Sequence, residues 1–199
     1  MPDIPSEDII DRLAGIAPGS PLDATRARRP QARANAERSY RELFEPQHPE
    51  GLSLRERLAV AAFVAGLHGS GPAAEHYARL LADRIGDSAL SAAIADAATS
   101  AAGHGPYGRY PSTALKAEDR EGPVWRPDAK PAASLGPRIA AALAHTHMLV
   151  FHPRDADPQA LQTMLDSGLT TNEIVTLSQI VAFLSFQIRV IDGLRQLAS

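Results

Sequence analysis

Cysteine is absent from the 199-residue chain. The protein can therefore form no disulfide, no thiolate metal site and no thiol nucleophile. Aromatic residues are also few, at 5% of the chain, so alanine, leucine and isoleucine supply most of the apolar content. Alanine and leucine favour helices, whereas strands prefer β-branched and aromatic residues. The composition predicts an all-α protein.

The chain also lacks a strong charge of one sign and a long uninterrupted apolar run. Its formal net charge of −3 gives no reason to expect a nucleic-acid partner. The longest apolar stretch, 174–191, is interrupted by Gln179, Gln187 and Arg189, so a buried helix explains it better than a membrane span. The first residues lack the basic and apolar segments of a signal peptide. We expect a cytoplasmic protein with no membrane partner, which the missing cysteine also favours.

Apolar residues recur at helical spacing along the chain, and proline and glycine interrupt this pattern, which predicts a series of separate helices. Ser53 and Glu56 have the spacing of a capping box, in which each side chain accepts from the other residue's backbone N–H. Four arginines near the start are followed by glutamates, which predicts a solvated helix face. These arginines are Arg26, Arg28, Arg29 and Arg33. The expected helices cover residues 6–16, 30–44, 53–67, 73–85, 88–102, 138–151, 158–167 and 170–197.

The composition suggests four segments within one compact domain. Residues 1–50 form an N-terminal helical arm, 51–102 a first helical unit, 103–137 a Gly/Pro-rich connecting loop, and 138–199 a second helical unit. The connecting loop contains Tyr107, Tyr110 and Trp125. Because structureless loops of this length are uncommon in compact domains, we expect an ordered excursion pinned by its aromatics, or a crossover against a partner subunit.

An internal repeat relates the two helical units. Residues 51–56 read GLSLRE and residues 168–173 read GLTTNE, an offset of 117 (168 − 51). The same offset pairs Val64 with Val181 and Leu67 with Leu184. Capping boxes are common, so the shared start alone would be ordinary. The further matches favour a duplication and predict two equivalent long helices in one bundle.

The chain resembles the carboxymuconolactone decarboxylase and alkylhydroperoxidase (AhpD-like) family in three adjoining segments. They are residues 52–57 (LSLRER), the apolar helix after them and the sequence His68-Gly69-Ser70. Residues 168–173 and 181–189 (VAFLSFQIR) are similar to the closing helix of the peroxidase-related branch. The resemblance implies a duplicated helical bundle, commonly assembled into a homo-oligomer, for which a dimer, trimer or hexamer is expected here.

Active relatives imply a thiol peroxidase site with a C-x-x-C pair, a histidine and a glutamate. In the ungapped frame the two cysteines correspond to Ser70 and Ala73, the histidine to Tyr77 and the glutamate to Leu58. A serine hydroxyl has a far higher pKa than a thiol and cannot cycle through a disulfide. Peroxidase activity of that kind is therefore excluded for this chain alone, and whether the chain is an enzyme stays open.

The segment around the missing cysteines is still the expected pocket. Ser70, Glu75 and His76 are the candidate catalytic residues. His68, Tyr77, Gln187 and Arg189 are the candidate binding residues. The first hypothesis is a small-molecule binder, or the partner of a catalytically intact paralogue. The alternative is an acid–base enzyme of the decarboxylase type that uses His76, and a third is a structural oligomerisation module.

His145, His147 and His152 raise the question of a metal site. On a helix, residues two apart point about 200° away from each other, so His145 and His147 cannot face one ion without distortion. We instead expect histidines near a helix end, where they stabilise its negative pole. No metal and no cofactor are expected.

Overall fold

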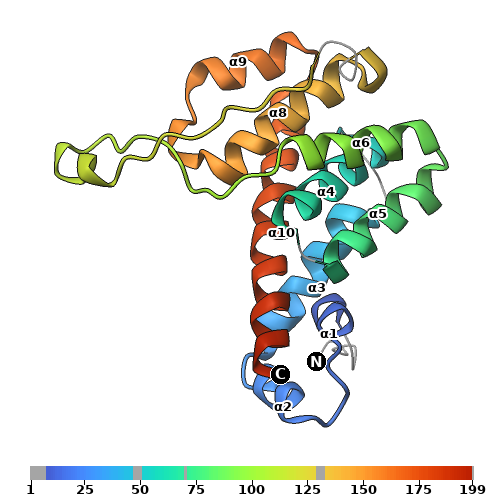
Figure 1. Ribbon diagram of the computed structural model, residues 1–199. Helices are drawn as coiled ribbons and strands as arrows, with labels where there is room; N and C mark the ends of the chain where they lie inside the picture. The colour runs from blue at the N-terminus through green and yellow to red at the C-terminus, as the bar shows by residue number, and fades with distance from the viewer. Residues whose placement is uncertain (1–7, 47–50, 70, 129–132, 199) are drawn as a thin grey trace.

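The computed structural model of the chain describes residues 8–46, 51–69, 71–128 and 133–198. Within these ranges the ordered elements are helices, and the β pairing is one isolated bridge between Gly108 and Arg120. The all-α prediction is confirmed (Figure 1). The α-helices are α1 (Ile9–Ala14), α2 (Pro21–Ala27), α3 (Pro30–Phe44), α4 (Leu54–His68), α5 (Gly71–Ile85), α6 (Ser88–Ser100), α8 (Pro137–Phe151), α9 (Pro158–Asp166) and α10 (Thr171–Ala198). Two short 3₁₀ helices are η1 (Thr113–Glu118) and η2 (Pro153–Asp155).

Side-chain caps set several of the helix starts. Asp8, Asp87 and Asp157 each accept a backbone N–H from the first turn of α1, α6 and α9. No helix was predicted between residues 16 and 30, where the structure has α2. Ser20 caps α2 and Pro21 occupies its first position, where the missing N–H of proline costs nothing.

Helix α4 is the centre of the bundle. Its residues 56–65 are all buried, and it packs against α5, α6, α8 and α10. A helix that is apolar on every side is stable in water only when neighbours cover it. Helix α6 packs very closely against α4, because a Cβ added at Gly66 would lie 2.7 Å from the Cβ of Ala98 on α6. Small residues therefore allow α4 and α6 to touch.

Helix α10 is the longest element and joins the two ends of the molecule (Figure 1). Its first half packs against α4 and α8, and its second half lies beside α1 and α3. In the described part of the chain, α10 is long and apolar enough to cross a membrane by length and composition alone. The central helix of a bundle meets the same criterion, so this observation is weak evidence for a span.

The N-terminal arm is held by buried ion pairs, which corrects the prediction for two of its arginines. Arg26 pairs with Asp8 and with Asp11, whose carboxylate is 2.9 Å from the arginine Nε. Arg33 pairs with Asp11 and Asp23, and it is only 9% exposed. These side chains are not on a solvated face, because α2 folds back and carries Arg26 onto the acidic start of α1. Arg28 and Arg29 are exposed as predicted.

Residues 103–128 of the connecting loop project from the bundle with η1 at the tip (Figure 1). Its base is pinned by aromatic side chains. The Trp125 ring lies 5.2 Å from that of Phe63 on α4, and the Arg154 guanidinium stacks on Tyr110. The base of the segment is therefore an ordered excursion held by its own aromatics, as one of the two predictions expected.

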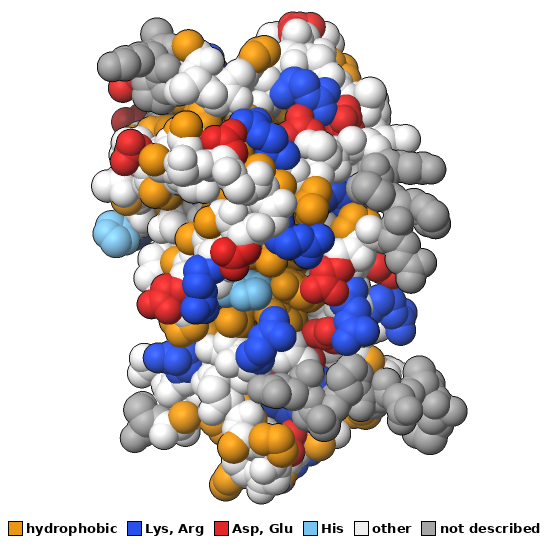
Figure 2. Space-filling model, turned by 90° about the vertical axis from the view of Figure 1, so that its right-hand side faces the viewer, with side chains coloured by type: hydrophobic (Ala, Val, Ile, Leu, Met, Phe, Trp, Pro, Cys, Tyr) orange, Lys and Arg blue, Asp and Glu red, His pale blue; other side chains and the backbone are white. Residues whose placement is uncertain are grey.

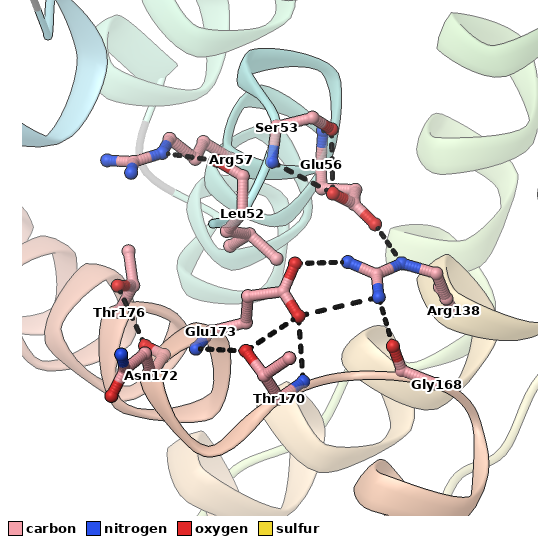
Figure 3. A network of polar contacts seen from close by, with 10 residues as sticks. All are labelled: Leu52, Ser53, Glu56, Arg57, Arg138, Gly168, Thr170, Asn172, Glu173 and Thr176. Carbon is pink, nitrogen blue, oxygen red and sulfur yellow. Dashed lines mark hydrogen bonds and ion pairs between the residues drawn. The ribbon is translucent and has the colours of Figure 1, made fainter. Parts of the chain in front are cut away.

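Arg138, on α8, joins the two capping boxes of the repeat (Figure 3). Ser53 with Glu56 forms one box at the start of α4, and Thr170 with Glu173 forms the other at the start of α10. The Arg138 side chain donates to Glu56 over 2.7 Å and to Glu173 over 2.6 Å. It also donates to the Gly168 carbonyl. One cation therefore satisfies the equivalent carboxylates of both units.

The repeat-related helices also meet at their far ends. His68, the last residue of α4, hydrogen-bonds Ser185 of α10 over 3.3 Å, and these residues are 117 positions apart. Glu56 and Glu173 have the same offset at the other end. The helices α4 and α10 therefore run side by side in the same direction, and repeat-related residues meet directly at one end and through Arg138 at the other.

Candidate functional site

A hollow of about 500 Å³ lies beside the His68–Ser185 pair, where α4 ends against the middle of α10. The end of α8 and the first residues of the connecting loop complete its walls. We name it the seam hollow. It is lined by Leu67, His68, Gly103, His104, Gly105, Pro106, Leu149, Val150, Phe151, Pro153, Ser178, Val181, Ala182, Ser185 and Arg189.

The charge of the seam hollow comes from α10. Arg189 is exposed, and its Nη1 donates to the Ser185 carbonyl over 3.0 Å, which directs the side chain along the helix. Burial and the charge of Arg189 lower the pKa of His68, while Asp192 acts in the opposite direction. His68 is therefore neutral at pH 7, so that it can donate or accept one hydrogen bond.

The lining suits a small organic acid. Apolar side chains such as Leu149, Phe151 and Val181 form much of the wall, while Arg189 supplies a cation. The lining residues, all within the described part of the chain, include no carboxylate. Guanidinium groups bind carboxylates strongly through paired hydrogen bonds, and small-molecule sites typically measure about 300–1,000 Å³. The size and chemistry of the hollow are both compatible with such a ligand.

The predicted residues are distributed over separate places. His68 and Arg189, both predicted to bind, line the seam hollow. Ser70 lies outside the described residues. Glu75 is exposed on α5. His76 is half-buried on the same helix, and its Nε2 lies 3.1 Å from the Tyr40 hydroxyl of α3.

His76 has the wrong surroundings for a strong general base. Burial and the charges of Arg12 and Arg79 lower its pKa to about 4. Its hydrogen-bond partner is the Tyr40 phenol, which does not favour the protonated imidazole as a neighbouring carboxylate would. A histidine with so low a pKa is neutral at pH 7 but takes a proton weakly.

Tyr77 and Gln187 form a buried polar contact between α5 and α10. The Tyr77 hydroxyl donates to the Gln187 Oε1 over 2.6 Å, and burial raises the pKa of Tyr77. The other amide atom, Gln187 Nε2, is buried without a hydrogen-bond partner. Both residues were predicted to bind a ligand, and the structure places them in the core, where they hold two helices together.

The three histidines near the end of α8 are all buried, at 2–7% exposure. His152 caps α8 at its C-terminal end, contacts Asp155 over 3.0 Å and lies 2.9 Å from the Pro123 carbonyl oxygen. Burial and the charge of His152 lower the pKa of His147 to about 4, while the Ala101 backbone acts in the opposite direction. Among the described residues, no three histidine or acidic side chains are placed to hold a metal ion.

Sequence reasoning missed several walls of the seam hollow. Ser185 carried a usable signal, since it is the residue that the repeat pairs with His68. No sequence signal indicated that residues 103–106 and the end of α8 would form walls of the hollow, because these segments meet α10 only through the tertiary fold.

Two comparisons with known proteins identify no relative. No protein-family model matches the chain, and no curated protein matches it. The site must therefore be interpreted from its own geometry.

Proposed function

We propose that this chain is a cysteine-free member of the AhpD-like family that binds a small organic acid in the seam hollow. One observation carries the proposal. At the junction of the two repeat-related helices, a hollow of about 500 Å³ combines apolar walls with Arg189 and His68.

The family assignment is supported by the paired contacts of α4 and α10. Glu56 and Glu173 share Arg138, and His68 meets Ser185, so the two units face each other as duplicated units would. The chain contains no cysteine, and in the family frame Ser70 and Ala73 replace the reactive pair. The hydroxyl and methyl groups of these residues supply no thiolate. We therefore expect the chain to bind a ligand rather than to reduce a peroxide.

The alternative function is acid–base catalysis by His76. It is less well supported, because the charged groups that act on His76 are Arg12 and Arg79, and the pKa of about 4 weakens it as a base. A decarboxylase of this type should convert a lactone-type acid, and Phe replacement of His76 should abolish that turnover. Binding of an acid without turnover supports the first proposal.

We further propose that the chain assembles into a homo-oligomer in the cytoplasm, alone or with a catalytic paralogue. On α10, Val175 is 51% and Phe186 49% exposed, and apolar side chains of this kind are enriched in subunit contacts. Light scattering should give a mass that is a multiple of 21.2 kDa. A monomer mass at micromolar concentration would contradict the oligomer proposal.

Calorimetric titration with benzoate tests the binding proposal. Benzoate pairs a carboxylate with an apolar ring, which are the two features that the hollow favours. Arg189→Gln removes the cation, and we expect affinity to fall by about tenfold or more, since a charge-assisted hydrogen bond contributes about 1.5–3 kcal/mol and each 1.4 kcal/mol is tenfold.

Arg195→Gln is the matched control. Arg195 is also exposed on α10 but does not line the seam hollow, so the same loss of charge there should leave benzoate affinity unchanged. If the wild-type protein shows no benzoate binding, or if both variants weaken binding equally, the proposal is wrong.

A further inference from the structure

A second hollow, of about 440 Å³, lies between α8 and α9. Residues 124–127 of the connecting loop cover one side of it, and it shares no lining residue with the seam hollow. We name it the α8–α9 hollow. Its walls include the Trp125 indole, the Met148 and Met164 side chains and the methyl group of Ala144.

His145 is a buried polar residue of these walls with an unpaired nitrogen. It is 7% exposed, and its Nδ1 is buried without a hydrogen-bond partner. Of the two other histidines that line the hollow, His152 contacts Asp155 and Pro123, and His147 interacts with the Ala101 backbone. An unpaired buried polar atom costs free energy, and a ligand that supplies the missing partner recovers that cost.

The charges around the hollow favour an uncharged ligand. Burial lowers the pKa of His145, so the imidazole is neutral at pH 7. Arg126, Asp155 and Asp157 also line the hollow, and all three are exposed and of mixed sign. A charged ligand would lose its hydration among apolar walls without gaining a buried counter-ion.

We propose that the α8–α9 hollow is a second binding site, which takes an uncharged aromatic alcohol by packing it against Trp125 and hydrogen-bonding its hydroxyl to His145. The ring of such a ligand contacts the indole and the methionine side chains, which attract aromatic groups. Its hydroxyl serves as donor or acceptor, whichever the imidazole tautomer requires. This site is independent of the acid-binding site proposed above.

Trp125 provides a direct readout, because it is the one tryptophan in the chain. Benzyl alcohol is the probe, and the fluorescence of Trp125 is followed as the probe is added. We expect a saturable change in emission. His145→Leu retains an apolar side chain of similar bulk and removes the hydrogen bond, so the apparent affinity should fall about fivefold or more.

Two further measurements separate this site from the seam hollow and from a folding defect. Arg189→Gln should leave benzyl alcohol binding unchanged, and His145→Leu should leave benzoate binding unchanged. Thermal unfolding of His145→Leu should occur at or above the wild-type temperature, because the substitution removes an unpaired buried nitrogen. A linear, non-saturating emission change, or the wild-type affinity in a folded His145→Leu variant, would overturn the proposal.

Discussion

Replacing Arg138 by methionine should destabilise the protein far more than an ordinary surface substitution would. The guanidinium reaches Glu56 over 2.7 Å and Glu173 over 2.6 Å, and the two carboxylate side chains are only 12% and 8% exposed. Without Arg138, two buried like charges would face each other with no cation between them. Methionine preserves the apolar stem of the side chain, so the charge is the main change.

The magnitude follows from the contacts. Two charge-assisted hydrogen bonds contribute about 1.5–3 kcal/mol each, or about 3–6 kcal/mol together. The Arg138 side chain is 33% exposed, and both carboxylates keep their capping-box hydrogen bonds. Solvent screening and these remaining bonds reduce the loss, so we expect the free energy of unfolding to fall by about 2–4 kcal/mol.

Urea denaturation followed by far-ultraviolet circular dichroism measures this loss. Arg109→Met is the control, because its ion pair with Glu121 spans 3.4 Å and both side chains are more than three-quarters exposed. That variant should lose at most about 0.5 kcal/mol. Equal destabilisation by the two substitutions would refute the role given to Arg138.

The pH dependence of the Arg138→Met effect provides an internal check. Hydrogen bonds from Arg138 and the capping residues outweigh burial and lower the pKa of Glu56 below 4.5, and the bond from Arg138 is the main cause of the same shift at Glu173. Carboxylates with a lowered folded pKa stabilise the protein above their unfolded pKa, and this stabilisation is lost as the pH falls through the folded value. The difference between wild type and variant should therefore shrink below about pH 4.

Two further predictions concern packing and protonation. Gly66→Ala should destabilise the protein by about 1–3 kcal/mol, because the new Cβ would lie 2.7 Å from Ala98, whereas Gly193→Ala meets no atom within 4 Å and should be neutral or stabilising; thermal unfolding compares them. The pKa values of His76 and His147 are both lowered to about 4 from 6.5, so the unfolded chain binds more protons between these values and stability should fall as the pH drops from 6.5 to 4. The double variant His76→Phe with His147→Phe should have a flatter stability profile across that range, and an unchanged slope would show that these histidines do not cause the acid sensitivity.

The sequence predicted best those helices whose ends are marked by local capping residues. Ser53 with Glu56, and Thr170 with Glu173, give the beginnings of α4 and α10 to within a residue. Helix α2 was missed because it is short and exposed, so it carries no apolar periodicity, although Ser20 and Pro21 signalled its start. The burial of Arg33 was unpredictable for a different reason, since its acidic partners lie on α1 and α2.

The seam hollow could be predicted only in part. The resemblance and the helix ends drew attention to His68 and Arg189, both of which line it. Tyr77 and Gln187 were polar residues within apolar helices, and sequence alone does not tell a ligand-binding pair from a pair that satisfies itself in the core. Figure 2 shows basic and acidic side chains interspersed over one face, in keeping with the small net charge.

A crystal of the protein soaked with 4-bromobenzoate tests the binding claim most directly, because bromine is located by its anomalous scattering. We expect a bromine peak inside the seam hollow, with the carboxylate of the probe at hydrogen-bond distance from Arg189. Bromine bound elsewhere, with the seam hollow holding only solvent at saturating probe, would contradict it.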